Sequence, residues 1–344
     1  MAGSTSTTAA TGGGGTISQP PPAGSLGTAG SSGIGGSAAG GSAAGMSGMS
    51  GMSGMSGMSG MGDGMSGSGA AGASGMSGSG EAGMGGSAGS GPAMGGCTPA
   101  PSGTFETTSA PGGPGGNYVI FLPRTLGEGG FKHPPVAWGN GLATAPSSYT
   151  ELLNNLAEQG FVVIANPGTG SDPQVVRQGL EWLIMQDSGS GELAGKLAVD
   201  CAGTIGYSMG GGAAVGSGSH PAVKAIVSMH GLPDASGSAS GPILLTTSDG
   251  DTFVAKAGFV MPCYDRSTKQ PTIMATHSPG AQVVGFGDHL EPLGAGGLDA
   301  EPAIAWLRYW LYGDQAQRDW FYGASCKLCA GEWTDIQRKN HTWD

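Results

Sequence analysis

The sequence predicts an α/β protein with a mostly parallel sheet and helices on both faces, preceded by a long low-complexity segment. Three observations lead to this prediction. Strand-like apolar runs alternate with helical patterns from about residue 118 onward. One strand ends in Gly206-Tyr-Ser-Met-Gly210 and is followed at once by small residues that suit a closely packed helix. The composition of residues 1–96 differs sharply from that of residues 97–344.

Residues 1–96 hold 34 of the 72 glycines and 11 of the 16 methionines, but no Lys, Arg, Cys or aromatic residue. A segment with so little bulky apolar surface cannot offset the entropy lost on folding, so we expect it to be disordered. Its Met-Ser-Gly triplets, from Met46 to Met61, lack the proline of collagen and are interpreted as repeat expansion in a linker. One folded domain is predicted over 97–344.

A series of apolar runs predicts the strands of this domain. The run Phe-Val-Val-Ile-Ala at 161–165 contains no polar residue, which is typical of a strand covered on both faces. We predict strands at 118–123, 135–138, 161–165, directly before Gly206, at 223–229, at 242–247, and at either 271–276 or 282–285. Because helical patterns separate most of these runs, the sheet should be mostly parallel.

Helices are predicted between the strands. Ser147 or Ser148 suits the cap of the first helix, and Asp172-Pro173 suits the cap and first residue of the second. We predict helices at 147–158, from 173 to about 186, directly after Gly210, and at 302–312. These elements nearly fill the 97–344 segment, so we expect no lid domain.

The Gly-x-Ser-x-Gly motif at 206–210 predicts a nucleophile. A strand, this motif and a small-residue helix together form the nucleophile elbow of the α/β-hydrolase fold. The serine of such an elbow lies on a strained turn, and the flanking glycines allow the backbone to fold tightly. We therefore predict that Ser208 is the nucleophile.

A serine hydroxyl needs a base, and the base needs an orienting acid. In this fold the acid and then the histidine follow the serine along the chain, each on a loop after a later strand. The loop after 242–247 offers Asp249 and Asp251. We favour Asp251, which precedes Thr252, and interpret Asp249 as a turn residue, although the alternative stays open.

His289 is the favoured base, because it lies in a loop after an apolar run and before the last helix. His277, at a strand end, remains the alternative. His230 precedes the candidate acid and is assigned to the cleft wall. The other histidines are less suitable by position: His133, His220 and His341.

The oxyanion of an acyl-transfer reaction needs backbone donors. We expect one from Met209, the residue after the nucleophile. The second is assigned to Leu142 in the glycine-containing loop after the 135–138 strand. No cofactor and no metal are expected, because a serine triad needs neither.

The net charge of −11 and the absence of any basic cluster argue against nucleic acid as a partner. No apolar stretch approaches 18 residues, so no membrane span is expected. We expect a monomer that binds an ester substrate.

The glycine-rich leading segment favours a secreted or surface-exported protein whose signal peptide has been removed. Among the five cysteines, Cys326 and Cys329 are expected to form a local disulfide.

The segments 141–149, 156–164, 206–212, 251–252 and 287–289 resemble those of the lid-less α/β-hydrolases that include bacterial cutinases and polyethylene terephthalate hydrolases, with chlorophyllase-like esterases as relatives. The resemblance covers about residues 104–329. It implies Ser208, Asp251 and His289 as the triad, and an oxyanion donor at Leu142. Two of the departures from the family pattern concern the substrate cleft: Leu142 replaces an aromatic residue, and the tryptophan expected near His230 is missing.

The sequence thus predicts a serine carboxylester hydrolase acting on polyesters and short-chain esters. One alternative is an esterase for small molecules or lipids that does not act on polymers. Another is a catalytically inactive hydrolase fold displayed at a surface.

Overall fold

The computed structural model describes residues 97–232 and 236–344. The predicted disorder of residues 1–96 and the interpretation of their Met-Ser-Gly repeat lie outside the described residues.

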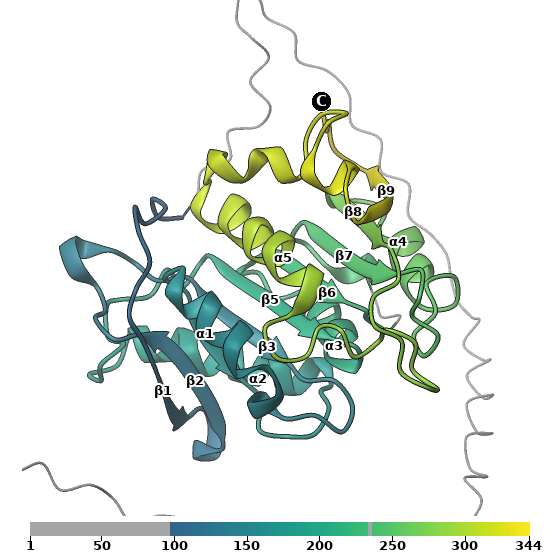
Figure 1. Cartoon of the computed structure of the whole chain (residues 1–344). Coiled ribbons are helices and arrows are strands. Elements are labelled where there is room, and N and C mark those ends of the chain that lie inside the picture. Colours follow the sequence, from purple (N-terminus) through teal and green to yellow (C-terminus); the bar gives the residue numbers. More distant parts are fainter. Residues whose placement is uncertain (1–96, 233–235) are drawn as a thin grey trace, which may run out of the picture. The chain divides into compact units, whose positions relative to one another are not determined.

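A single nine-stranded sheet runs through the domain in the order β1-β2-β4-β3-β5-β6-β7-β8-β9 (Figure 1). From β4 to β8 all neighbouring strands are parallel, whereas β1, β2 and β9 pair antiparallel at the two edges. The strands are β1 Thr107–Gly112, β2 Tyr118–Pro123, β3 Pro135–Gly139, β4 Val162–Ala165, β5 Ala202–Tyr207, β6 Val223–Met229, β7 Ile243–Ser248, β8 Thr272–His277 and β9 Trp333–Lys339.

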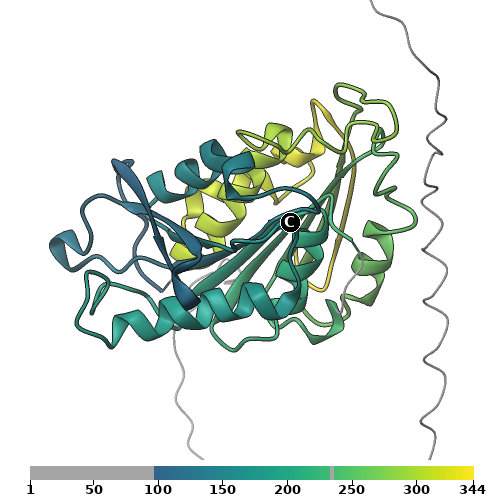
Figure 2. The ribbon, with the colours of Figure 1, turned by 90° about the horizontal axis from the view of Figure 1, so that it is seen from below.

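Helices cover both faces of the sheet (Figure 2). Leucines of α1 and the apolar face of α5 join one buried cluster, while α2, α3 and α4 join a second cluster on the opposite face. Burial of two such apolar layers against the sheet is the main favourable term in folding. The helices are α1 Thr150–Glu158, α2 Pro173–Asp187, α3 Met209–Ser217, α4 Val260–Arg266 and α5 Ala300–Leu307.

The architecture confirms the predicted α/β class with a mostly parallel sheet. Asp172 caps α2 as expected, because its side chain accepts the N–H of Val175 at 3.0 Å. The cap predicted for α1 is wrong: Tyr149 occupies that position and no side chain caps the helix, because a short 3-10 turn, Pro146–Tyr149, leads into it.

Two further differences concern strands. Of the two alternatives for the last predicted strand, the structure has β8, whereas 282–285 lies in a loop. The edge strands β1 and β9 were not predicted from the sequence. Both are largely half-exposed and lack the continuous apolar run of the central strands.

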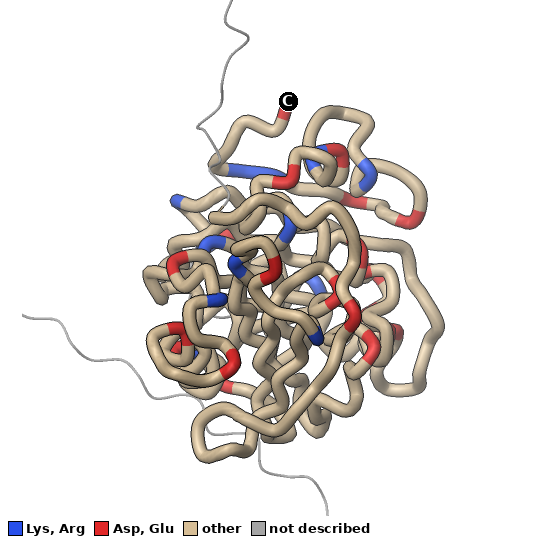
Figure 3. The backbone as a smooth tube through the Cα atoms, turned by 90° about the vertical axis from the view of Figure 1, so that its left-hand side faces the viewer, with Lys and Arg blue, Asp and Glu red and all other residues tan. Residues whose placement is uncertain are grey.

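Two disulfides link distant and local parts of the chain. Cys326 and Cys329 are bonded, which confirms the predicted local pair, and Cys97 is bonded to Cys201 across 104 residues of sequence. Cys263 lies buried in α4. Along the backbone drawn in Figure 3, Lys and Arg positions are interspersed with Asp and Glu positions. Among the described residues, no helix is both long enough and apolar enough to cross a membrane.

His133, just before β3, is a buried structural histidine. Its Nε2 accepts the N–H of Gly127 at 3.1 Å, and its Nδ1 lies 2.7 Å from the carbonyl oxygen of Gly160. Burial lowers the pKa of His133, an effect that the bond to Gly160 opposes and the charge of Lys196 reinforces. A neutral ring fits this pair of partners, since a proton on Nε2 would face another donor.

This lowered pKa predicts a loss of stability in mild acid. The unfolded chain binds a proton near pH 6.5 that the folded chain resists, so the free energy of unfolding should fall as the pH drops below about 6.5. The side chain introduced by His133→Asn cannot titrate. The free energy of unfolding of this variant should therefore fall less between pH 7 and pH 5, although it is already lower than that of the unmodified protein at pH 7. Urea unfolding of both proteins at the two pH values measures this difference, and equal falls would contradict the prediction.

Candidate active site

Ser208 lies on the turn between β5 and α3. Its φ of 56° and ψ of −121° form a conformation that residues other than glycine rarely adopt. The Ser208 N–H donates to the carbonyl oxygen of Met229 at the end of β6 (2.9 Å), and the Ser208 carbonyl accepts the N–H of Leu232 (3.1 Å). These bonds to the end of β6 and to the segment that follows it hold the strained turn in place.

The glycines on either side of Ser208 are required by close backbone approach. A Cβ on Gly210 would collide with the carbonyl group of Gly139 at the end of β3, and a Cβ on Gly206 would collide with the carbonyl group of Gly210. The start of α3 therefore packs directly on the ends of β3 and β5.

Three side chains from separate segments meet at this turn. His289 Nε2 lies 3.0 Å from Ser208 Oγ, and His289 Nδ1 lies 2.7 Å from Asp251 Oδ2. All three residues are buried. When Nδ1–H donates to the carboxylate, the lone pair on Nε2 faces the serine hydroxyl and can accept its proton. The structure thus brings together the three residues that the sequence singled out.

Asp251 follows β7 and is held by four hydrogen bonds. Its Oδ1 accepts the N–H groups of Phe253 and Val254 at 3.0 and 2.7 Å, while Oδ2 contacts His289 and also His230 Nδ1 at 2.8 Å. Burial alone would raise the pKa of Asp251, but the hydrogen bonds from His230 and His289 outweigh it and lower the pKa well below its usual range. The carboxylate is therefore ionised at neutral pH.

The two alternative residues lie elsewhere. Asp249 is partly exposed and contacts Lys256 Nζ at 2.8 Å and Thr334 Oγ1 at 3.0 Å. His277, at the end of β8, has its Nδ1 2.9 Å from the carbonyl oxygen of Ser278. Neither side chain contacts Ser208.

Reasoning from the sequence missed that His230 is a hydrogen-bond partner of Asp251. The residue follows β6 with a φ of 47°, and its ring is fully buried instead of lining the cleft wall. Burial lowers the pKa of His230, but the carboxylates of Asp299 and Asp251 outweigh this effect and raise the pKa to about 10. Its position directly after an apolar strand, beside the elbow strand, was the available signal.

The Tyr207 side chain holds the loop that carries His289. Its hydroxyl donates to the carbonyl oxygen of His289 at 2.5 Å, and its ring lies 5.0 Å from the imidazole, centroid to centroid. Burial, together with the charges of Tyr149 and Asp251, raises the pKa of Tyr207. The phenol is therefore a permanent donor that fixes the backbone of His289.

Met209 and Leu142, the residues predicted to supply the oxyanion donors, both lie close to Gly170. A Cβ on Gly170 would stand 3.1 Å from the sulfur of Met209 and 3.7 Å from the Cα of Leu142. Met209 is the first residue of α3, so its N–H has no acceptor within the helix. The side chain of Leu142 is 58% exposed.

Two buried asparagines fix the loops around these donors. Asn140 Nδ2 donates to the carbonyl oxygens of Asn166 and Gly168, at 2.9 and 2.8 Å, and Asn140 Oδ1 accepts the indole N–H of Trp138. Asn166 Oδ1 in turn accepts the hydroxyl of Ser171 at 2.7 Å. This network rigidifies the backbone that precedes Leu142.

Exposed apolar side chains lie near His289. The rings of Phe253 and Phe286 lie 5.0 Å apart, and Phe253 lies 5.1 Å from the ring of His289. Phe253 is 44% exposed, and Val284 on the adjoining loop is 98% exposed. Together with Val283 and Leu142, these residues are named here the apolar rim.

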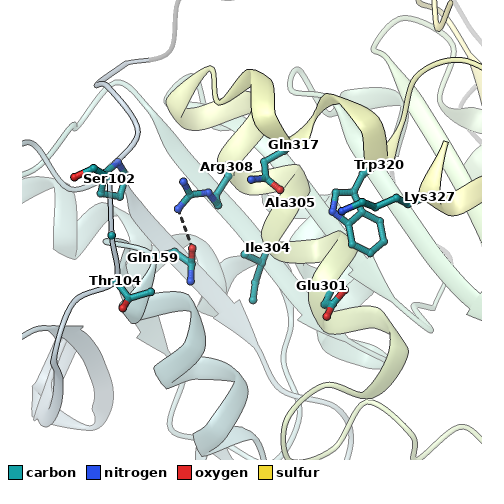
Figure 4. Close-up of a pocket in the computed structure, with 12 residues that line it drawn as sticks. Ser102, Thr104, Gln159, Glu301, Ile304, Ala305, Arg308, Gln317, Trp320 and Lys327 are labelled. Carbon is teal, nitrogen blue, oxygen red and sulfur yellow. Dashed lines mark hydrogen bonds between the residues drawn. The ribbon is translucent and has the colours of Figure 1, made fainter.

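A well-formed hollow of about 410 Å³ lies elsewhere, with lining residues from α5 and from the segment before β1 (Figure 4). Arg308 crosses it and donates to Gln159 at 2.8 Å. None of its lining residues belongs to the Ser208 site, so it is not the catalytic cleft.

Two groups of side chains bring potential metal ligands together within 4.8 Å. One is Asp251 with its two histidines. The other shares His230 and adds His277, Glu291 and Asp299.

A nucleophile elbow on the central strand of a mostly parallel sheet, with a histidine in contact with the serine, defines an α/β-hydrolase. A family model described as PETase, PET hydrolase-like, matches residues 88–337. The chain therefore belongs to the PET hydrolase-like family, a family of carboxylic ester hydrolases. No curated protein matches the sequence.

Removing the Tyr207 hydroxyl should impair catalysis more than stability. Tyr207→Phe frees the carbonyl of His289, so we expect kcat on p-nitrophenyl butyrate to fall about tenfold, while the free energy of unfolding falls by only about 1 kcal/mol. Tyr118→Phe is the matched control, because that hydroxyl donates to Val175 on α2 at 3.1 Å. Similar kcat values for the two variants would argue against a positioning role.

Proposed function

We propose that this protein is a serine carboxylester hydrolase that works through an acyl-enzyme. Ser208 Oγ attacks the ester carbonyl while His289 Nε2 accepts its proton, and the ionised Asp251 stabilises the imidazolium that forms. The N–H groups of Met209 and Leu142 hold the oxyanion. His289 then protonates the leaving alcohol, and a water molecule activated by the same histidine releases the acid.

The observation that carries this proposal is the unbroken line of contacts from Ser208 Oγ to His289 (3.0 Å) and from His289 to Asp251 (2.7 Å). A serine on a strained turn next to a histidine of fixed tautomer is what nucleophilic catalysis requires. Membership of a carboxylic ester hydrolase family supports an ester as the substrate.

The apolar rim supports a polyester as the substrate within this class. Phe253, Phe286 and Val284 expose apolar surface beside His289, and such a surface suits adsorption onto a neutral, water-insoluble chain. The aromatic pair also offers stacking partners for a substrate ring, which Leu142 cannot. An esterase limited to small molecules or lipids, and an inactive displayed fold, are the competing interpretations.

We further propose that the protein acts as a monomer outside the cytosol. Two disulfides, Cys97–Cys201 and Cys326–Cys329, support export, because such bonds persist in oxidising compartments. Fractionation of producing cells, with titration of thiols in the recovered protein, tests this location. Recovery of a reduced protein from the cytosol would contradict it.

Substitution of Asp251 and of Asp249 should show which of the two aspartates orients His289. Asp251→Asn should lower kcat on p-nitrophenyl butyrate by about 10³–10⁴-fold, because the amide favours the wrong tautomer of His289. Asp249→Asn should stay within about twofold of the unmodified protein. A large loss in Asp249→Asn, with normal activity in Asp251→Asn, would reverse the assignment.

Labelling with a fluorophosphonate probe tests the nucleophile. We expect stoichiometric labelling of the unmodified protein and none of Ser208→Ala. Neither labelling nor ester turnover by a folded sample would favour the inactive displayed fold.

The polymer proposal predicts a selective effect at the apolar rim. In a Val284→Ser, Phe286→Ser variant, product release from amorphous polyethylene terephthalate film should fall about tenfold or more, because the adsorbing surface is lost. Turnover of soluble p-nitrophenyl butyrate should change far less. Met185→Ser is the matched control, since Met185 is 59% exposed on α2 but outside the rim. Turnover of the soluble ester without any release from film by the unmodified protein would favour the small-ester esterase.

A further inference from the structure

Four buried or half-buried side chains converge next to Asp251. They come from the ends of β6 and β8 and from the segment that connects β8 to α5: His230, His277, Glu291 and Asp299. One potential ligand atom from each lies within 4.8 Å of the others. The proposed ester hydrolysis uses none of these four side chains directly.

The hydrogen bonds of the two histidines leave their Nε2 atoms facing one another. His230 Nδ1 contacts the carboxylate of Asp251 at 2.8 Å, and His277 Nδ1 contacts the carbonyl oxygen of Ser278 at 2.9 Å. Both partners are acceptors, so each Nδ1 carries a proton. The two Nε2 atoms are nevertheless only 3.4 Å apart, so their lone pairs would repel unless one ring carries a proton on Nε2 or a metal ion lies between the two rings.

The two carboxylates also turn an oxygen toward this point. Glu291 Oε1 accepts the N–H of Leu298 at 2.6 Å, whereas Glu291 Oε2 has no hydrogen-bond partner among the described residues. Asp299 is fully buried at the start of α5, and its side chain does not cap the helix. Within the described residues its oxygens make no well-aligned hydrogen bond, and Oδ2 has an ion-pair contact of 3.3 Å with His230 Nε2. A carboxylate buried in this way is costly unless a cation compensates it.

The charges of the cluster do not balance. Asp251, Glu291 and Asp299 bring three carboxylates together, and their recorded ion pairs within the described residues involve only histidines. One imidazolium would still leave an excess of negative charge. A divalent cation would offset it.

We propose that His230, His277, Glu291 and Asp299 form a structural site for a divalent metal ion of the zinc class. In a tetrahedral site with metal–ligand distances of about 2.0–2.1 Å, ligand atoms lie about 3.3–3.4 Å apart. His230 Nε2 lies 3.4 Å from His277 Nε2 and 3.3 Å from Asp299 Oδ2, and Glu291 Oε2 is 4.0 Å from His277 Nε2. Imidazole with carboxylate is a ligand set that suits zinc.

The Nδ1 contacts of His230 and His277 are typical of histidines that bind a metal through Nε2. A ligating imidazole usually donates its other N–H to a carboxylate or a backbone carbonyl, as His230 does to Asp251 and His277 does to Ser278. The ion would tie the ends of β6 and β8 to the segment that carries His289. Its role is to position that segment, and it takes no part in the attack of Ser208.

Metal content of the full-length protein tests the site. Protein purified without chelator, incubated with zinc sulfate and passed through gel filtration should contain about one equivalent of zinc by mass spectrometry. Ser208→Ala should contain the same amount, so the result does not depend on the proposed function. His277→Gln and Asp299→Asn should lose most of the metal while keeping their far-ultraviolet circular dichroism.

Two further measurements hold even if those variants fail to fold. X-ray absorption at the zinc edge of the unmodified protein should show only nitrogen and oxygen ligands at about 2.0–2.1 Å. Excess zinc should raise Tm by about 5–10 °C over chelator-treated protein. Protein that retains no zinc, cobalt, nickel or manganese and shows no change in Tm would overturn the proposal, leaving a proton on His230 as the compensating cation. Zinc retained by folded His277→Gln and Asp299→Asn would also overturn it, because the ion would be bound elsewhere.

Discussion

The buried carboxylate of Asp251 is the constraint on which the rest of the site depends. An ionised carboxylate in a protein interior is stable only when its lone pairs are occupied, and here two backbone N–H groups serve one oxygen and two imidazoles serve the other. To supply those donors, the turn after β7, the end of β6 and the segment before α5 must all converge. The orientation of His289 toward Ser208 is a result of that convergence.

The sheet topology explains how much of this could be predicted. Parallel strands end at one edge, so Ser208, Asp251 and His289 could be proposed as candidates from their order after three strands of the sheet. Asp249 and Asp251 share one turn, and only tertiary contacts separate them: Asp249 pairs with Lys256 and Thr334. Those contacts carry no local pattern, so the sequence left the alternative open.

The features that could not be predicted depend on contacts between distant parts of the chain, which leave no signal in the local sequence. The edge strands β1 and β9 are half-exposed and acquire their strand geometry from pairing with a distant neighbour, without an apolar run of their own. His230 and Asp299 are separated by 69 positions in the sequence, yet His230 Nε2 lies 3.3 Å from Asp299 Oδ2. No sequence periodicity connects the two residues. The site therefore has two sides, an apolar rim facing outward and a charged cluster facing inward, and the sequence indicated neither.

The Cys97–Cys201 disulfide determines how the folded domain would respond to mechanical force. Cys97 is the first described residue, and Cys201 directly precedes β5, the strand that leads to Ser208. Tension on the chain before Cys97 would therefore pass through a covalent bond into the central sheet. The elements from β1 to α2 lie inside the closed loop and would carry no load, so pulling could not peel them away from the edge of the domain. A domain bonded in this way can be held by its N-terminal side without unravelling the segment between the two cysteines.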